Sequence, residues 1–223
     1  MLARAGYIEE ALFASLCDGV RQYVIVGAGL DTFALRHPEL SERLSVIEID
    51  HPATQAFKRA RMAQAALSVP RNLHFVAADL ERDSIADALR GTAYDPSVPA
   101  FFACSGVAYY LNNEAVLATL RSISSVAAPR SQVLFDYFEA GAFAPDAPLR
   151  IRFVVERSRE VGEPLKSSLD PAKLRADLAA VGLQLTEDLG PDEIQSRLLA
   201  NLRGFQAVPY WHFVQATRKA ADV

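Results

Sequence analysis

The sequence predicts an α/β fold, in which a mainly parallel sheet carries helices on both faces. Short apolar runs such as Tyr23–Val26 and Leu44–Ile49 have the composition of strands that are buried on both faces. Segments with helical spacing of apolar residues separate these runs, and strands that alternate with helices form βαβ units. The chain has 223 residues, enough for one such domain with its own core, so we expect a single domain over residues 1–223.

The expected elements follow in order along the chain. Ile8–Leu16 has the apolar spacing of an amphipathic helix, and Pro52 suits the first turn of a helix that we expect to reach about Leu67. The other helices are expected at Ser84–Leu89, Asn113–Ala127, Leu149–Val161 and Pro171–Val181. The strands are expected at Tyr23–Val26, Leu44–Ile49, Leu73–Ala77, Ala100–Cys104, Gln132–Tyr137, Leu183–Asp188 and Trp211–Thr217. The stretch Gly141–Pro148 is expected to be a loop.

Composition excludes several classes of protein. Hydrophobic residues make up 51% of the chain and charged residues 22%, and no apolar run approaches the roughly 20 residues of a membrane span. The net charge is −4 and most basic residues are scattered, so we expect neither a nucleic-acid nor a membrane partner. The N-terminal stretch lacks the features of a signal peptide, which indicates a cytoplasmic protein. The oligomeric state stays open, a homo-oligomer included.

The cysteines and histidines show no metal-ligand spacing, so we predict no metal site. Cys17 and Cys104 lie in apolar sequence surroundings, and we expect both to be reduced, buried thiols. The acidic pair Glu187 and Asp188 is expected to be a solvated strand end.

Ligands of open parallel sheets bind beyond the carboxyl ends of the strands. Four positions satisfy this rule: the turn after Val26, Asp50, the pair Asp79 and Leu80, and the segment Ser105–Tyr110. Gly27 and Gly29 allow a tight turn and the close approach of a ligand. Asp50 ends the next strand, where a carboxylate can accept hydrogen bonds from both ribose hydroxyls. The glycine pair can equally be a structural turn, and Asp50 can equally cap the helix that begins at Pro52.

The residues of the glycine turn favour S-adenosylmethionine over a dinucleotide. The run is Gly27-Ala28-Gly29-Leu30-Asp31-Thr32, and Thr32 replaces the third glycine of a dinucleotide motif. Asp31 places a carboxylate near the position of a pyrophosphate, and like charges ~4 Å apart repel by about 1 kcal/mol in water and about 4 kcal/mol at an effective dielectric of 20. S-adenosylmethionine carries a sulfonium and an ammonium and no phosphate. The alternative for Asp31 is a helix cap.

Several ordered strings of the sequence carry a family resemblance. They are VGAGLDTFALR, EIDHPATQAFKRARM, FVAADLERDS, FFACSGVAYYLNNEAVLATL and GEPLKSSLDPAKLRADLAAVGLQLTEDLGPDE. Together they resemble the leucine carboxyl methyltransferase family, and specifically its bacterial branch of polyketide-type O-methyltransferases. The resemblance covers nearly the whole chain. It implies a Rossmann-like class I methyltransferase fold, with a mainly parallel seven-stranded sheet whose last strand is antiparallel.

The resemblance also implies roles for individual residues. Arg4 matches an arginine that pairs with the methionine carboxylate of the cofactor, Gly27 the glycine beneath the cofactor, and Asp50 the ribose acid. Asp79 and Leu80 match the pair that holds the adenine. The expected cofactor site therefore consists of Arg4, Gly27, Ala28, Gly29, Asp31, Asp50, His51, Asp79, Leu80 and Ser105. Without the resemblance, Arg4 is equally well explained as a solvated charge at a frayed terminus.

Two departures from the family pattern bear on activity. Ser105 stands where family members often carry a glutamate near the methyl donor, so a charged partner of the cofactor is lost. Family members also have a longer N-terminal segment that covers the site, whereas three residues precede Arg4 here. We expect this lid to be absent or to come from elsewhere.

The expected reaction is transfer of a methyl group to a small-molecule hydroxyl or carboxylate, and the resembled branch acts in polyketide biosynthesis. A carboxylate acceptor needs no general base, whereas for a phenol or alcohol Tyr110 and Asp136 are candidate catalytic bases. Two alternatives remain. One is a methyltransferase-like protein that binds the cofactor without efficient turnover. The other is an NAD(P)-dependent oxidoreductase, which would share the strand, the turn and the ribose acid.

Overall fold

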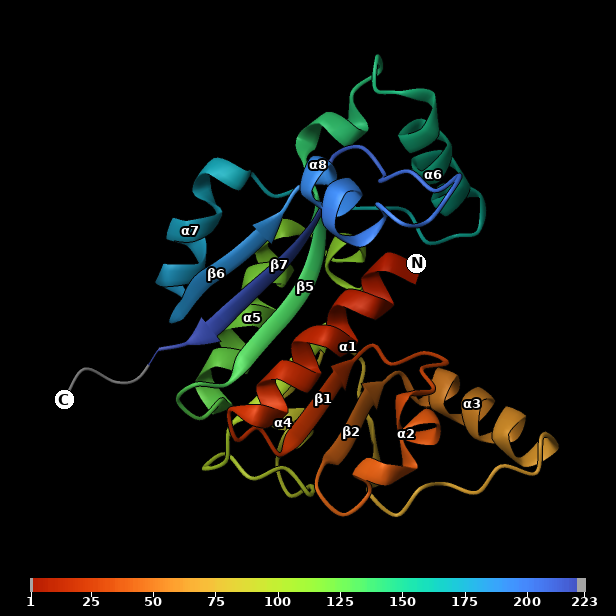
Figure 1. The fold of residues 1–223 in the computed structure, drawn as a ribbon, viewed down its shortest axis with the longest axis vertical. Coiled ribbons are helices and arrows are strands. Elements are labelled where there is room, and N and C mark those ends of the chain that lie inside the picture. The colour runs from red at the N-terminus through yellow and green to blue at the C-terminus, as the bar shows by residue number, and fades with distance from the viewer. Residues whose placement is uncertain (1, 220–223) are drawn as a thin grey trace.

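A seven-stranded sheet runs through the centre of the molecule in the computed structural model, which describes residues 2–219 (Figure 1). Its strands are β1 (Gln22–Val26), β2 (Ser45–Asp50), β3 (Leu73–Ala77), β4 (Ala100–Cys104), β5 (Gln132–Phe138), β6 (Leu183–Leu189) and β7 (Trp211–Arg218). Their order across the sheet is β3-β2-β1-β4-β5-β7-β6.

The pairing of the strands locates the place where a ligand binds. β1 pairs in parallel with β2 on one side and with β4 on the other, so the strand order reverses at β1. Open parallel sheets bind ligands beyond the carboxyl ends of the strands at such a switch point. β7 is antiparallel to both of its neighbours, β5 and β6. The predicted fold class, including the antiparallel last strand, is confirmed.

Helices and short turns connect the strands. The helices are α1 (Leu2–Cys17), α2 (Phe33–Arg36), α3 (Pro52–Gln64), α4 (Ile85–Leu89), α5 (Asn113–Val126), α6 (Leu149–Glu160), α7 (Pro171–Ala180) and α8 (Pro191–Glu193). The 3₁₀ turns lie at Pro38–Leu40, Ala108–Tyr110 and Ala140–Phe143, and a π-helical turn at Ile194–Leu198 follows α8. Within residues 2–219, no helix has the length and apolar character needed to cross a membrane.

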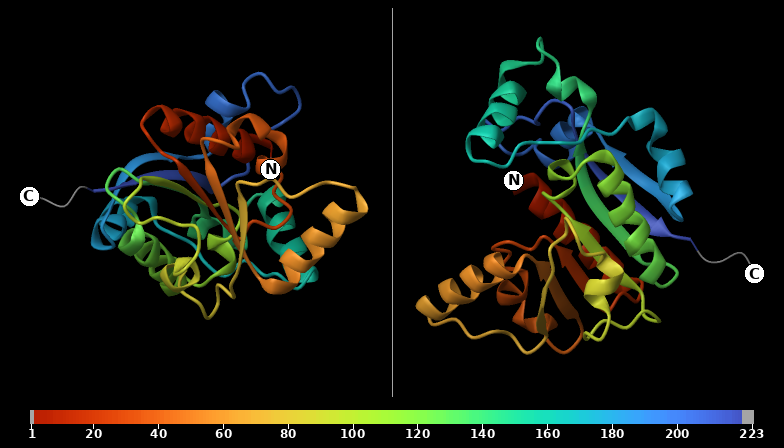
Figure 2. Two further views of the ribbon diagram at one scale, coloured as in Figure 1. Left: turned by 90° about the horizontal axis from the view of Figure 1, so that it is seen from below. Right: turned by 180° about the vertical axis from the view of Figure 1, so that it is seen from behind.

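Both faces of the sheet are buried under helices (Figure 2). On β1, Val24 and Val26 belong to the apolar cluster that includes residues of α4, α5 and α7. Tyr23 and Ile25 alternate with them along the strand and belong to the cluster on the other face, with α1 and α2. Because both faces are covered, a ligand reaches the sheet only at the ends of its strands.

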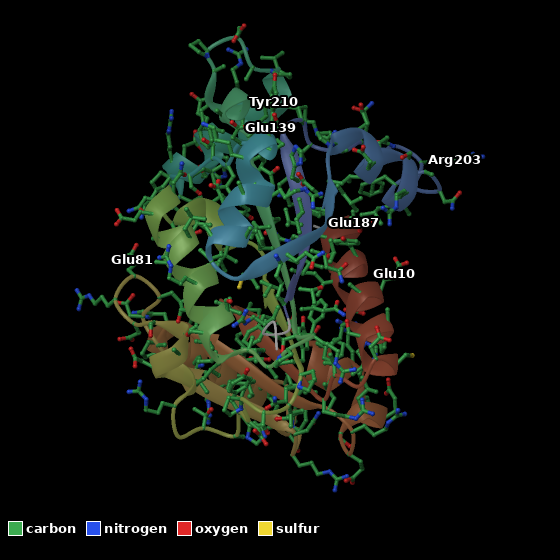
Figure 3. The ribbon with its side chains drawn as sticks, turned by 90° about the vertical axis from the view of Figure 1, so that its left-hand side faces the viewer. Glu10, Glu81, Glu139, Glu187, Arg203 and Tyr210 are labelled. Atoms are coloured by element: carbon green, nitrogen blue, oxygen red, sulfur yellow. The ribbon has the colours of Figure 1, made fainter. Side chains whose placement is uncertain are left out.

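Two connections form a cap beyond the carboxyl end of β5, which we define as residues 139–161 and 190–210. Glu139 N–H donates to Tyr210 O at 2.9 Å, and Arg150 Nη1 donates to Ala207 O at 3.3 Å, so the two segments are bonded to each other. Glu139 and Tyr210 accordingly lie together in the upper part of the view in Figure 3. A separate apolar cluster packs residues of the cap against Phe138 and Tyr109; the cap residues are Ala142, Ala147, Ile151 and Val155.

Several expected boundaries need correction. The helix expected at Ile8–Leu16 begins at Leu2, so Arg4 lies within a helix and not at a frayed terminus. α3 ends at Gln64 rather than at Leu67, because Ala66 adopts a left-handed φ of +52°. The stretch expected to be a loop from Gly141 begins inside a 3₁₀ turn.

The expectation that both cysteines are buried is wrong for Cys17. The buried positions of α1 near its end are Ala11, Leu12 and Ser15, and Cys17 lies beyond them on the exposed side of the helix. Cys104, on the central strand β4, is buried as expected.

The expectation of a solvated acidic pair at the end of β6 is also wrong. Asp188 Oδ1 lies 2.9 Å from His212 Nδ1, and its Oδ2 accepts a hydrogen bond from Tyr137 OH at 3.1 Å. Glu187 accepts from Tyr7 OH at 2.5 Å. The partners come from α1, β5 and β7, which the sequence of β6 does not reveal.

Candidate active site

The turn after β1 exposes its backbone at the switch point. Gly27 and Gly29 have φ values of +69° and +54°, in the left-handed region that favours glycine. A Cβ atom on Gly27 would lie 2.4 Å from Val107 Cγ2, so close packing restricts this position as well. Gly27 N–H donates to Ile49 O at 2.8 Å, which ties the turn to the end of β2.

Backbone groups hold the carboxylate of Asp50 in one orientation. Its Oδ2 accepts from Gly29 N–H at 2.5 Å, and its Oδ1 accepts from His51 N–H at 2.6 Å. Each oxygen keeps a further lone pair for a ligand. The cap of α3 is His51, whose Nδ1 accepts from Ala53 N–H at 3.2 Å. Asp50 is therefore not the cap of this helix.

Two cavities meet above the carboxyl ends of β1 and β4. The β2 lobe, about 430 Å³, is lined among others by Asp50, Thr54 and Leu80. The α1 lobe, about 570 Å³, is lined among others by Arg4 and Ser105. Both lobes share the residues Gly27, Gly106 and Tyr110, so they adjoin there, and we call the two lobes together the groove.

The structure brings most of the predicted site residues to this groove. The predicted residues that line the β2 lobe are Gly27, Gly29, Asp50, Leu80 and Tyr110. Those that line the α1 lobe are Arg4, Gly27, Ala28, Asp31, Ser105 and Tyr110. His51, Asp79 and Asp136 line neither lobe.

Two of the predicted acids make local hydrogen bonds. Asp31 Oδ1 accepts from Phe33 N–H at 2.7 Å, at the start of α2, so Asp31 also stabilises the end of its own turn. Asp79 Oδ1 accepts from Glu81 N–H at 3.1 Å, and its Oδ2 lies 3.5 Å from Arg82 Nε. These contacts orient Asp79 within the loop that follows β3.

Ser105 carries an unsatisfied polar group on the wall of the α1 lobe. Its Oγ is buried and has no hydrogen-bond partner within residues 2–219. A buried hydroxyl without a partner costs about 1–3 kcal/mol. A polar group of a ligand in this lobe would remove that cost.

Arg4 is held at the α1 lobe by a buried acid. Its Nη1 donates to Asp136 Oδ2 at 2.9 Å and to Tyr109 OH at 3.0 Å. Asp136 also accepts from Gly106 N–H at 2.7 Å and from Trp211 Nε1 at 3.0 Å. Burial by itself would lower the pKa of the Arg4 guanidinium, but the charge of Asp136 raises it above its ordinary value. Arg4 is therefore a fixed positive charge beside the groove.

Neither candidate base is placed to take a proton. The Asp136 carboxylate is fully buried and engaged by three donors. Burial and the charge of Glu163 raise the pKa of the Tyr110 phenol, which keeps it protonated at neutral pH. Tyr110 can therefore donate a hydrogen bond to a ligand rather than accept its proton.

The sequence analysis missed one wall of the site, which we call the strap and define as residues 162–168. Four of its residues line the β2 lobe, namely Gly162, Glu163, Pro164 and Lys166. Lys166 N–H donates to Tyr109 O at 2.7 Å, and Ser167 Oγ donates to Ala108 O at 2.9 Å. No motif in the strap indicates which part of the sheet it covers, because these contacts reach back across the whole of β5 and α6.

Comparison with known sequences identifies the family. A sequence model of the leucine carboxyl methyltransferase family matches residues 1–124. The chain is also 37% identical over 219 residues to "Putative S-adenosyl-L-methionine-dependent methyltransferase YktD" of Bacillus subtilis (strain 168), which covers 96% of this chain and 72% of that protein. The chain belongs to the leucine carboxyl methyltransferase family. It is a methyltransferase, and S-adenosylmethionine is its cofactor.

Comparison with solved structures supports the class I methyltransferase fold. Magnesium protoporphyrin IX methyltransferase from Synechocystis PCC 6803, solved with S-adenosylhomocysteine, has a TM-score of 0.59 at 13% identity and covers 98% of this chain and 84% of that chain. The O-methyltransferase NcsB1 from neocarzinostatin biosynthesis has a TM-score of 0.53 at 18% identity and covers 89% of this chain and 49% of that one. The chain also spans about half the length of the Mycolicibacterium and Mycobacterium relatives that it matches.

Proposed function

We propose that this methyltransferase transfers the methyl group to an oxygen of a small-molecule acceptor that arrives as an oxyanion, either a carboxylate or an acidic phenol. The two adjoining lobes of the groove at the switch point carry the proposal. Its β2 lobe presents the oriented carboxylate of Asp50, and its α1 lobe presents Arg4 and the unpartnered hydroxyl of Ser105. The carboxylate of Asp50 suits the cofactor ribose, and Arg4 suits the cofactor carboxylate. The Ser105 hydroxyl can make a hydrogen bond to a polar group of a ligand.

The residues of the groove fit the parts of the cofactor. The remaining lone pairs of Asp50 suit the ribose hydroxyls. Leu80 and Pro164 provide apolar walls for the adenine in the β2 lobe. Arg4 uses only Nη1 for its hydrogen bonds within residues 2–219, so the other edge of its guanidinium can bind the methionine carboxylate.

The protein contributes alignment rather than acid–base chemistry in this proposal. When bound, the cofactor supplies an electrophilic methyl group on its sulfonium. Arg4 and Asp50 hold the methionine end and the ribose of the cofactor in the two lobes. The Tyr110 hydroxyl, where the lobes adjoin, orients the acceptor oxygen. Asp31, on the wall of the α1 lobe, places a negative charge that favours a cationic cofactor.

The absence of a suitable proton acceptor at the two candidate positions favours an acceptor that is already ionised. Asp136 is buried and Tyr110 is protonated, so neither activates an alcohol. NcsB1, which has the same fold, was solved with 2-hydroxy-5-methyl naphthoic acid, an aromatic acid. An aromatic hydroxy acid of the polyketide type is therefore the acceptor class that we propose.

Calorimetric titration tests the cofactor half of the proposal. We expect S-adenosylhomocysteine to bind and NADH not to bind. Replacement of Asp50 by alanine removes the group that accepts hydrogen bonds from the ribose hydroxyls. We expect it to lower the affinity for S-adenosylhomocysteine at least about tenfold. Asp18→Ala is the matched control, because Asp18 is an exposed acid just before the opposite, amino end of β1. Unchanged affinity in Asp50→Ala contradicts the proposed site.

A labelled methyl donor tests the acceptor half. Benzoic acids and phenols of graded acidity are offered at one pH, with aliphatic alcohols as the control series. We expect labelled methyl esters and aryl ethers from acceptors that are ionised at that pH, and no product from the alcohols. Product from the alcohols alone, or from no acceptor in any series, contradicts oxygen transfer to an oxyanion.

A further inference from the structure

Asp136 connects three segments that are far apart in the sequence. Its carboxylate is fully buried at the carboxyl end of β5. It accepts hydrogen bonds from Arg4 on α1, Gly106 after β4 and Trp211 at the start of β7, across separations of 132, 30 and 75 residues. The Arg4 guanidinium carbon also lies 5.6 Å from the centre of the Trp211 ring. Asp136 therefore does more than pair with one arginine.

The geometry of the arginine gives this connection a consequence for ligand binding. A guanidinium is planar and rigid, so two directional hydrogen bonds from one of its nitrogens orient the whole group. Asp136 and Tyr109 both hold Nη1 of Arg4, and the rest of the guanidinium borders the α1 lobe beside Gly106. The same carboxylate positions the backbone of Gly106, which also lines the lobe.

We propose that Asp136 is a positioning residue for the amino-acid end of the cofactor. It orients the free edge of the Arg4 guanidinium and the Gly106 turn toward the methionine carboxylate, and Trp211 holds Asp136 in this orientation. Asp136 itself lines neither lobe and does not contact the ligand. The proposal rests on the proposed function, because it places the methionine carboxylate at Arg4.

A purely structural role for Asp136 predicts a different result from a positioning role. Loss of fold stability weakens every ligand of the groove. Loss of positioning weakens the binding of only those ligands that have an amino-acid end, such as S-adenosylhomocysteine. The binding of 5′-methylthioadenosine, which lacks that end, stays unchanged. The two affinities, measured on the same variant, therefore separate the two roles.

The experiment measures both affinities by calorimetry for the wild type, Asp136→Asn, Arg4→Gln and the double variant. We expect Asp136→Asn to lower the affinity for S-adenosylhomocysteine about tenfold or more. The affinity for 5′-methylthioadenosine should stay within about twofold of the wild-type value. Arg4→Gln should show the same selectivity. The double variant should bind no more weakly than Arg4→Gln alone, because Asp136 acts through Arg4.

Glu48→Gln provides the matched control. Glu48 forms a buried ion pair with Lys58 at 2.5 Å, and neither residue lines the groove. This variant should lower the melting temperature and leave the ratio of the two affinities unchanged. If Asp136→Asn does not fold, Trp211→Phe removes a single donor to Asp136 and should show the same selectivity with a smaller loss.

Equal weakening of both ligands in Asp136→Asn, or additive losses in the double variant, overturns the positioning role. In that case the wild type still binds S-adenosylhomocysteine, so the cofactor half of the proposed function stands. Failure of the cofactor half of the proposed function is distinct, because the wild type would then bind neither S-adenosylhomocysteine nor 5′-methylthioadenosine.

Discussion

The two walls of the groove are built from contacts of different range. On the β1–β2 wall, Asp50 is bonded to Gly29 N–H and to the next residue in the chain, at the ends of two neighbouring strands. On the α1 wall, Arg4, Asp136 and Trp211 come from the first helix, the fifth strand and the last strand. The first wall follows from local turn geometry and the second from tertiary packing, so substitutions should affect them differently.

The largest effect is expected at the turn of the β1–β2 wall. Gly27→Ala places a Cβ 2.4 Å from Val107 Cγ2 and forces alanine to a φ of +69°. Left-handed strain and a steric clash together should lower the free energy of unfolding by about 3 kcal/mol. Urea denaturation of the protein without ligand measures this change.

Gly29→Ala is the control that isolates the clash from the strain. Gly29 has a φ of +54°, but a Cβ there meets nothing within 4 Å. We expect a loss of about 1 kcal/mol from the strain alone. Equal losses in the two variants would show that the packing against Val107 does not restrict the turn.

An intermediate, pH-dependent effect is expected at His212, which follows Trp211 of the α1 wall on β7. Its Nδ1 lies 2.9 Å from Asp188 Oδ1 and its Nε2 lies 2.8 Å from Glu139 Oε1. Burial by itself would lower the pKa of the imidazole, but the hydrogen bonds to the two carboxylates raise it above 6.5. Because the folded pKa is the higher one, the stabilisation is complete below about pH 6.5 and is lost as the pH rises through the folded value.

His212→Gln should therefore destabilise the protein more at about pH 6 than at a pH above the folded pKa of His212, where the imidazole is neutral in both states. Denaturation curves of both proteins across this range measure the difference. Glu139→Gln removes one of the two carboxylates and should reduce the pH dependence without abolishing it, because Asp188 remains. A difference that is constant with pH contradicts a charged His212.

The smallest effect is expected where the strap meets the loop after β3. Lys166 Nζ lies 3.3 Å from Glu81 Oε1, and the two side chains are 46% and 70% exposed. Water and salt screen such a pair, so Lys166→Gln should change the affinity for S-adenosylhomocysteine by less than about threefold. A larger loss that persists in high salt would assign Lys166 a direct contact with the cofactor.

The site residues could be predicted where the strand pattern places them. Gly27, Asp50 and Ser105 each follow a buried strand, and parallel strands bring their carboxyl ends to one edge. Cys17 and Asp188 were placed wrongly, because helix rotation and partners on other strands decide their burial. The role of Asp136 could not be predicted for the same reason, because its three hydrogen-bond donors lie 30 to 132 residues away in the sequence.

The sequence by itself determined the α/β fold, the glycine turn and the acid that follows the second strand. Hydrophobic periodicity and glycine conformation are local properties, and they act within a few residues of chain. Only the tertiary structure decided that the strap closes the β2 lobe and that Asp136 holds Arg4 at the α1 lobe. These arrangements depend on buried hydrogen bonds between segments that the sheet order brings together, and no local pattern specifies such partners.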